Sequence, residues 1–123
     1  MKDDDMIEQE IQAKGITAPR VTPTDIEATN AGEHYFTGAE AAGVSGLYGE
    51  ESKVSSSLQA LRLLTFCVLV LKNGFTVTGE SACASPENLD AELGKKIARQ
   101  NAVAKMWPLL GYALKERLAR GEA

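Results

Sequence analysis

The residue types best suited to chemistry lie in residues 79–88, where small and hydroxyl side chains join a predicted strand to a predicted helix. Ser85 and Pro86 have the order of a helix N-cap and a first helical position. Backbone N–H groups left unpaired at a helix start can hold a phosphate or a carboxylate. The predicted anion-binding residues are the polar side chains of this segment and the cations that follow it: Ser81, Ser85, Asn88, Lys95, Lys96 and Arg99. The alternative is an ordinary connection whose Ser and Asn side chains only cap the helix.

Other reactive side chains are few. Cys83 lies two residues before Ser85, and a helix N-terminus can lower a thiol pKa. The alternative for Cys83 is a small buried thiol. His34 is the single histidine and is interpreted as a surface or capping residue, with a role as ligand or base as the alternative. Because the chain has no P-loop, GxSxG or HExxH signature, we expect a non-enzymatic protein without a cofactor or a metal.

Two pairs of aromatic residues could stack on a nucleotide base if they are exposed. Tyr35 and Phe36 precede a glycine-rich stretch, and Trp107 and Tyr112 flank Pro108. Packing in the core is the alternative for both pairs.

The charge is distributed unevenly along the 123 residues, whose formal net charge is −4. Residues 1–57 carry 4 Lys and Arg against 11 Asp and Glu, whereas residues 94–123 carry 7 against 2. Two solvated faces that attract each other, within one chain or between subunits, would explain this pattern. Alternatively, the basic last third gathers an anionic ligand. Duplex DNA is an improbable partner for an acidic chain, because phosphate neutralisation dominates that kind of binding.

The composition indicates a single soluble domain. No apolar run is long enough to span a membrane, and the acidic N-terminus does not have the pattern of a signal peptide. Cys67 and Cys83 are too few for a disulfide framework, so we expect reduced thiols in a cytoplasmic protein.

The first half of the chain predicts two short helices and a loop. Ile7 and Ile11 followed by Gly15 indicate a helix over residues 3–14. Thr22 before Pro23 indicates an N-cap for a second helix that extends to Ala31. We therefore divide the chain into an N-terminal helical segment (1–36), a flexible loop (37–57) and a hairpin-helix core (58–119). Residues 58–64 are either a helical turn or the start of a strand.

Residues 65–80 predict a β-hairpin that turns at Asn73-Gly74, the typical pair of a type I′ turn. A two-residue turn would place Val70 opposite Val77 and Val68 opposite Gly79. The first strand would then be apolar on both faces, which an isolated hairpin does not tolerate. Another element or a second subunit must cover the second face, so we expect a homodimer or larger assembly.

The C-terminal third predicts two helices, over residues 86–107 and 109–119, because Pro108 kinks or ends a helix. At 100° per residue, one arc of the first helix is mainly apolar and is predicted to face the core: Leu89, Leu93, Ile97, Gln100, Val103 and Ala104. The predicted fold class is α+β, a hairpin packed against C-terminal helices with short N-terminal helices.

The hairpin and the following helix resemble a phage and prophage protein family catalogued as gene-product 49 / gene-product 66. The resemblance is carried by LTFCVLVLKNGFTVTGESACA at residues 64–84, PENLD at 86–90, Trp107-Pro108-Leu109 and Gly111-Tyr112. It covers most of the chain outside residues 38–57 and departs at Leu89, where the family typically has an aromatic residue. It implies a phage accessory protein in the cytoplasm of the bacterial host, and it brings no established activity or catalytic residues.

The expected function is therefore a non-enzymatic binding module that sequesters a small anionic ligand, such as a nucleotide signal in host defence. The alternative is an interaction module that masks a host or phage protein through the exposed strand face and the acidic N-terminal half.

Overall fold

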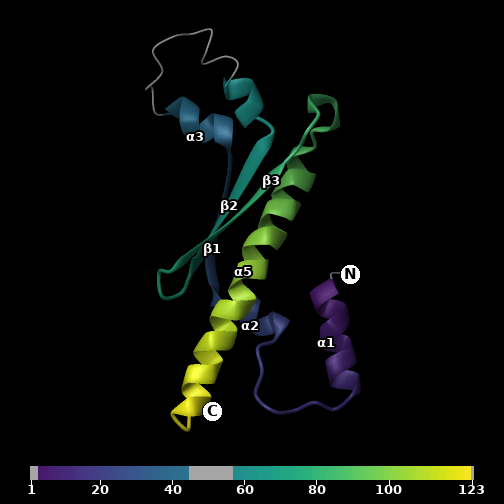
Figure 1. The fold of residues 1–123 in the computed structure, drawn as a ribbon, viewed down its shortest axis with the longest axis vertical. Coiled ribbons are helices and arrows are strands. Elements are labelled where there is room, and N and C mark those ends of the chain that lie inside the picture. Colours follow the sequence, from purple (N-terminus) through teal and green to yellow (C-terminus); the bar gives the residue numbers. More distant parts are fainter. Residues whose placement is uncertain (1–2, 45–56, 123) are drawn as a thin grey trace.

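A three-stranded antiparallel sheet lies against one long helix, which confirms the α+β class (Figure 1). The computed structural model describes residues 3–44 and 57–122. The strands are β1 (Asn30–Thr37), β2 (Leu64–Leu71) and β3 (Thr76–Ala82), in the order β1-β2-β3. The long helix is α5 (Ala91–Ala119), and it packs on β2 and β3.

The central strand, β2, is apolar on both faces, as the sequence predicts. Cys67, Leu69 and Leu71 are buried on the face that α5 covers. Phe66 and Val68 point to the other face, where they are only half-buried. One face of the strand is therefore in the core, and the other forms an open apolar surface.

The hairpin is present, but its predicted register is wrong by one residue. The amide of Gly74 donates to the carbonyl of Leu71, and the amide of Leu71 donates to the carbonyl of Phe75, so the turn contains three residues. Gly74 has a φ of 88°, whereas no residue other than glycine has a positive φ in the part of the chain that the structure describes. A type I turn followed by a left-handed glycine fits this pattern, and a type I′ turn does not.

This register moves the side chains of β3 to the opposite face from the one predicted. Val77 pairs with Leu69, and Gly79 pairs with Cys67, on the side of the sheet that α5 covers. Thr76 and Thr78 pair with Val70 and Val68 on the open face. The two threonines of β3 therefore lie on the open face, and Val77 and Gly79 meet the helix.

The strand β1 was not predicted, because residues 1–36 were interpreted as helical. Helix α2 (Pro23–Thr29) ends two residues earlier than expected, and the chain then pairs antiparallel with β2. The pairing has an irregularity between Asn30 and Gly32. The polar sequence Gly-Glu-His has no apolar alternation, so the strand is specified by pairing with β2 rather than by a local pattern.

The other N-terminal predictions are confirmed with small changes. Helix α1 (Asp3–Ala13) ends before Gly15, which has a φ of 68°. Thr22 caps α2 in a capping box with Asp25. Helix α3 (Gly38–Val44) replaces the start of the predicted loop, and residues 45–56 of that loop lie outside the described residues. Residues 57–61 are helical, which resolves the ambiguity before β2.

The predicted break at Pro108 is absent, because α5 continues through it as a single helix of 29 residues. Its N-cap is Asp90, whose side chain accepts from the amide of Leu93. Ser85, the predicted N-cap, precedes only a short 3-10 turn (Pro86–Asn88) and makes no capping hydrogen bond. Met106 is buried and Leu110 is half-buried against the core, so packing on both sides of Pro108 holds the helix together.

The predicted core face of α5 is also wrong. Ala98, Ala102 and Met106 are fully buried, whereas Leu93 and Ile97 are 53% and 40% exposed. The large apolar residues of the predicted arc therefore lie mainly away from the sheet, although Val103 is half-buried against the core.

Gly79 explains why small residues of α5 face the sheet. A Cβ atom at Gly79 would lie 2.8 Å from the Cα of Ala102, and closer still to the carbonyl oxygen of Ala98 and the amide nitrogen of Ala102. The backbones of β3 and α5 therefore approach until no side chain fits between them. Only a helix face of small residues can approach so closely, so alanines rather than leucines occupy it.

Replacing Gly79 with alanine tests this contact. We expect Gly79→Ala to reduce the free energy of unfolding by about 3 kcal/mol or more, because the added methyl group meets backbone atoms that cannot change rotamer. Urea unfolding followed by circular dichroism measures the change.

Gly43→Ala is the matched control, since a Cβ there meets nothing within 4 Å and the position is helical. It should leave stability unchanged or raise it by up to about 1 kcal/mol. Equal stability of the Gly79 variant and the wild type would contradict the close approach.

Candidate functional site

The predicted anion-binding residues do not converge on one site. Ser81 Oγ donates to the carbonyl of Gly94 at 2.7 Å, and the backbone carbonyl of Ser85 accepts from Cys83 Sγ at 3.1 Å. Asn88 lies in the short 3-10 turn rather than at the start of α5. The open helix start of the prediction is therefore absent, because a carboxylate from Asp90 already caps α5.

The predicted cations are also partly engaged. Lys95 forms an ion pair with Glu92 at 3.6 Å on the surface of α5. Lys96 is exposed and has no ion-pair partner among the residues that the structure describes. Of the three cations, only Arg99 is half-buried and contacts acids from other elements of the fold.

Arg99 joins three elements of the fold. Its guanidinium lies 2.8 Å from Glu33 on β1 and 3.0 Å from Glu27 on α2. The hydrogen bond from Arg99 lowers the pKa of the Glu33 carboxyl, and the hydrogen bond to Glu33 raises the pKa of Arg99. Arg99 therefore holds the helical side of the domain to the sheet, and its charge is largely neutralised.

The predicted stacking residues do not form two platforms. Tyr35 and Phe36 point to opposite faces of β1. Tyr35 packs against the core and donates to Glu33 Oε2 at 3.0 Å, and burial is the main reason that its pKa is raised. Phe36 contacts Phe66 on the open face, with ring centroids 5.6 Å apart.

Trp107 and Tyr112 are likewise separated. Trp107 is half-buried and its Nε1 donates to Asp4 Oδ2 at 3.0 Å. Tyr112 is 70% exposed and points away from the core. Trp107 also lines a cavity.

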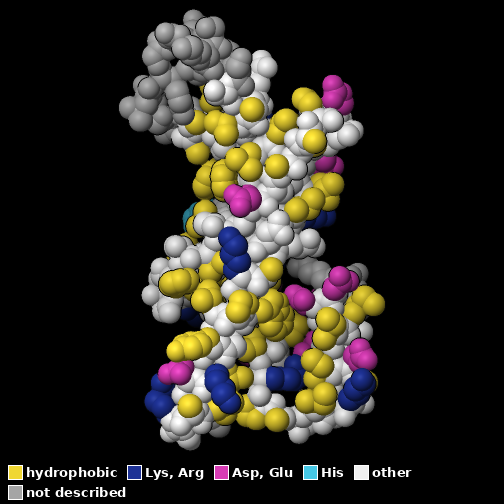
Figure 2. Space-filling model, in the orientation of Figure 1, with side chains coloured by type: hydrophobic (Ala, Val, Ile, Leu, Met, Phe, Trp, Pro, Cys, Tyr) yellow, Lys and Arg dark blue, Asp and Glu magenta, His cyan; other side chains and the backbone are white. Residues whose placement is uncertain are grey.

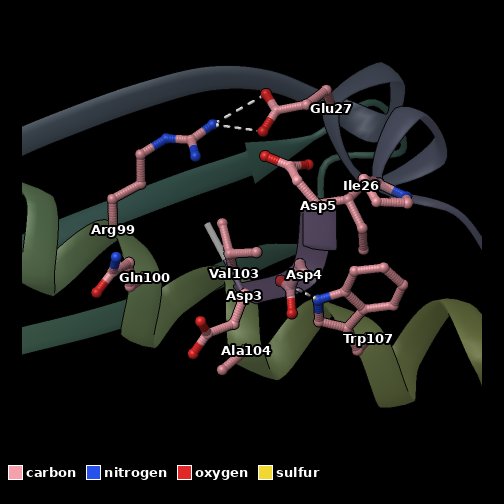
Figure 3. Close-up of a pocket in the computed structure, with 11 residues that line it drawn as sticks. Asp3, Asp4, Asp5, Ile26, Glu27, Arg99, Gln100, Val103, Ala104 and Trp107 are labelled. Atoms are coloured by element: carbon pink, nitrogen blue, oxygen red, sulfur yellow. Dashed lines mark hydrogen bonds and ion pairs between the residues drawn. The ribbon is translucent and has the colours of Figure 1, made fainter. Parts of the chain in front are cut away.

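A cleft of about 450 Å³ lies between α1, α2 and α5 (Figure 3). Its floor is apolar, with Ile26, Val103 and Trp107, and Figure 2 shows the hollow with acidic side chains beside it. Its lining comes from the first turn of α1, from α2 and from one side of α5: Asp3, Asp4, Asp5, Pro23, Ile26, Glu27, Arg99, Gln100, Val103, Ala104 and Trp107.

The charge of this cleft is strongly negative. Of its four carboxylates, Glu27 is paired with Arg99 and Asp4 accepts from Trp107. Asp3 and Asp5 face α5 across the cleft and have no partner among the described residues (Figure 3). An ammonium or guanidinium group would be attracted there, and its aliphatic stem could lie on the apolar floor, with Trp107 available for a cation–π contact.

Sequence reasoning identified Arg99 and Trp107 but missed the acidic wall. Asp3, Asp4 and Asp5 were interpreted only as a charged terminus. The spacing of Arg99, Val103 and Trp107, four residues apart, puts them on one side of a helix and could have indicated a shared surface. What it could not show is that α1 lies opposite that surface.

Helix α1 is attached to the body at few points. The guanidinium of Arg20 donates to both carboxylate oxygens of Glu8, which lowers the pKa of Glu8 to about 2. A smaller cavity of about 230 Å³, lined in part by Ile7, Ile11 and Trp107, separates the apolar side of α1 from the body.

A third hollow, of about 440 Å³, lies between the hairpin turn, α2 and the last turns of α5. Three cations line it, Arg20, Lys72 and Arg117, together with one carboxylate, Asp25. Arg20 is paired with Glu8, but Lys72 and Arg117 have no ion-pair partner among the described residues. We call it the basic groove.

The remaining candidates do not form sites. His34 lies on the open face of the sheet opposite Val68. Within the described residues, no group of three or more His, Cys, Asp or Glu could hold a metal ion. In the same residues, no helix has the length and hydropathy that crossing a membrane requires.

Comparison with known proteins places most of the chain in a family. The model of the phage protein (N4 Gp49/phage Sf6 gene 66) family matches residues 21–118, which confirms the resemblance found in the sequence. No curated protein and no solved structure matches the chain significantly. The match begins after α1, so the acidic wall of the cleft lies outside the matched residues while Arg99 and Trp107 lie inside them.

The Arg99 network predicts a pH-dependent contribution to stability. The pKa of Glu33 in the folded protein lies below its ordinary value of 4.5. Ionised Glu33 therefore stabilises the fold above about pH 4.5, and this contribution disappears as the pH falls through the lowered pKa. The difference in unfolding free energy between the wild type and Glu33→Gln should be present at pH 7 and shrink at pH 3.

Arg99→Gln should move the pKa of Glu33 back toward 4.5 in an NMR titration, because its main hydrogen-bond donor is lost. Lys96→Gln removes an equal charge from the same helix and should leave the pKa of Glu33 unchanged. An unshifted Glu33 in the wild type would contradict the network.

Proposed function

We propose a protein-binding role for this chain, which belongs to the phage protein family whose model it matches. In this proposal the chain is a phage accessory protein that acts without catalysis in the cytoplasm of the bacterial host. The cleft between α1, α2 and α5 receives a basic side chain from a host or phage protein.

The observation that carries the proposal is the pair of unpaired carboxylates above an apolar floor. Asp3 and Asp5 face the cleft without a partner among the described residues, while Trp107 and Val103 lie below them. A free cation in water would gain little from two exposed carboxylates alone. A Lys or Arg side chain gains more, because its stem buries apolar surface while its charge meets the acids.

A binding role is favoured over catalysis by the lining itself. It contains carboxylates, one arginine, one amide and apolar side chains, and it contains no Cys, Ser or His. The one arginine is already held by Glu27 and Glu33. The cleft therefore offers charge and apolar contact to a ligand, and its lining contains no thiol, hydroxyl or imidazole side chain.

Trp107 provides a direct measurement, because it is the only tryptophan in the chain. We expect its fluorescence to change on titration with a hexapeptide of alternating Arg and Leu, and not with the peptide in which Glu replaces Arg. Asp3→Asn with Asp5→Asn should weaken the affinity for the Arg-Leu peptide about tenfold, because two exposed ionic contacts contribute about 1.4 kcal/mol together.

The matched control is Glu87→Gln with Glu116→Gln, which changes the net charge equally at exposed sites outside the cleft. This control variant should lose much less affinity for the peptide. If the control variant loses as much affinity as the cleft variant, binding is a general charge effect and the cleft is not the site.

A small anion is the second candidate, and the basic groove favours it. Lys72 and Arg117 line that groove without ion-pair partners among the described residues, above the apolar side chains Val21, Leu110 and Leu114. This arrangement suits a ligand with an anionic head and an apolar body, such as a nucleotide. It replaces the predicted site around Ser81 and Arg99, whose residues the fold separates or engages.

Calorimetric titration with adenosine monophosphate tests this candidate. Lys72→Ala with Arg117→Ala should weaken binding about tenfold or more, and Lys96→Ala with Lys105→Ala, which lie outside the groove, should not. Absence of heat for the wild type at millimolar nucleotide would remove the candidate.

A further inference from the structure

The two outer strands of the sheet are not protected equally. On β3, the side-chain amide of Asn101 donates to the carbonyl of Glu80 at 2.7 Å, and α5 packs along the strand. On β1, the sequence NAGEHYFT contains neither Pro nor Lys, which often block such edges. The irregularity between Asn30 and Gly32 lies at the start of β1, and the pairing is regular from Gly32 onward. The outer edge of β1 can therefore pair with another strand.

The hydrogen bonds around β2 show which of its backbone groups point toward β3. In an antiparallel ladder, the N–H and C=O groups of successive residues point to alternate sides of a strand. The amide of Leu71 donates to the carbonyl of Phe75, and the carbonyl of Leu63, just before β2, accepts from the amide of Cys83. The odd-numbered residues of β2 therefore bond to β3, and the even-numbered residues bond to β1.

The same alternation assigns the backbone of β1. The even-numbered residues of β2 pair with three residues of β1, which therefore bond inward: Gly32, His34 and Phe36. The amide and carbonyl groups of Glu33 and Tyr35 consequently point outward, and none of the described residues outside the sheet bonds to them. Thr37 is the next outward residue, and its amide already donates to Glu40 Oε1 at 3.1 Å.

We propose that a second copy of the chain covers this edge, with the two β1 strands antiparallel and His34 of one copy opposite His34 of the other. In this register Glu33 of each copy lies opposite Tyr35 of the other. Each of these two pairs exchanges two backbone hydrogen bonds. All of the outward groups of Glu33 and Tyr35 are then paired, and the two sheets become one sheet of six strands.

The two neighbouring registers are less favourable. A pair centred on Glu33 would place two carboxylates directly opposite each other, which destabilises a sheet. A pair centred on Tyr35 would place Glu33 opposite Thr37, whose amide is held by Glu40. The register centred on His34 avoids both costs.

The side chains on the open face suit the same register. Phe36 of one copy lies opposite Gly32 of the other, where no side chain takes up space. The imidazole of His34 lies beside that glycine, since a Cβ atom at Gly32 would be 3.6 Å from His34 Nε2. The ring of Phe36 can therefore contact the imidazole of the other copy. A strand with a gap near one end and an aromatic ring near the other complements its own reversed copy, as a two-fold interface requires.

This pairing leaves the cleft of the proposed function open. No residue of β1 lines that cleft or the basic groove. Glu33 keeps its side-chain contact with Arg99, because the strands pair through their backbones. Self-association and peptide binding can therefore be measured separately.

The oligomeric state of the full chain is the first test. Sedimentation equilibrium should give a dimer for the wild type at micromolar concentration. Glu33→Pro removes an outward amide and leaves the bonds to β2 in place, since proline is tolerated where the N–H of an edge strand faces solvent. It should weaken association about 100-fold relative to Glu33→Ala, because the pair loses one hydrogen bond from each copy.

Glu33→Ala is the matched control, since it loses the same carboxylate and keeps the amide. At concentrations where both variants are monomeric, their unfolding midpoints should agree within a few degrees. His34→Pro removes an inward amide instead, and should unfold the domain. Equal association of Glu33→Pro and Glu33→Ala would overturn the proposal.

A charge at the centre of the pair tests the interface without changing the backbone. His34 and Thr78 are both exposed and lie on either side of Val68 in the sheet. His34→Lys places two like charges opposite each other and should weaken association about tenfold or more. Thr78→Lys adds the same charge on β3 and should sediment as the wild type does. An equal loss of association in both variants would refute the proposed edge.

Cysteine cross-linking tests the register. In a Cys83→Ser background, where Cys67 is buried, His34→Cys alone should form a covalent dimer on mild oxidation. Opposed Cα atoms in such a pair are about 4.5 Å apart, which a disulfide can span. Thr78→Cys should not cross-link, and efficient cross-linking through it would contradict the register. A monomeric wild type would overturn the proposal and leave the edge to a strand of another protein.

Discussion

The close approach of α5 to β3 at Gly79 determines most of this structure. Because the backbones leave no room for a Cβ atom at that position, only small residues of the helix can face it. Ala98 and Ala102 meet this requirement, and Met106 fills the wider space further along. The contact therefore fixes the rotation of α5 about its own axis, and every other side of the helix follows from that rotation.

The same rotation builds the cleft. With Ala98 and Ala102 on the sheet, Arg99, Val103 and Trp107 come to lie at the side of the helix that faces α2 and α1. Arg99 can then reach acids on both α2 and β1, which fastens the N-terminal elements to the sheet. Helix α1 is held by the contacts of Glu8 and Asp4 rather than by a packed interface, so a hollow remains between it and the body.

Two surfaces of different chemistry result from this arrangement. The cleft combines acids with an apolar floor and suits a basic side chain, whereas the basic groove presents Lys72 and Arg117 beside apolar side chains. The acidic wall of the cleft, formed by Asp3, Asp4 and Asp5, lies outside the residues matched by the family model, whereas α5 lies almost wholly inside them. The acidity of the cleft is therefore contributed mainly by the helix that precedes the matched residues.

The sequence by itself determined the elements with local signals. Thr22 before Pro23, Gly15 after a short helix and Asn73-Gly74 between apolar runs placed α1, α2 and the hairpin, because caps and turns depend on residues that are neighbours in the chain. The apolar run of β2 also indicated correctly that the strand is apolar on both faces. The resemblance to the phage protein family was carried in large part by the same apolar run and the residues that follow it.

Only the tertiary structure decided the partners of these elements. The register of the hairpin depended on whether Asn73 took a positive φ, and a shift of one residue exchanged the faces of β3. Strand β1 has no apolar alternation and exists because β2 offers it an edge. The core face of α5 went to its alanines rather than to its leucines, because a missing side chain on another strand allowed the backbones to touch. Periodicity shows that a helix has an apolar side, but the element it packs against decides which side is buried.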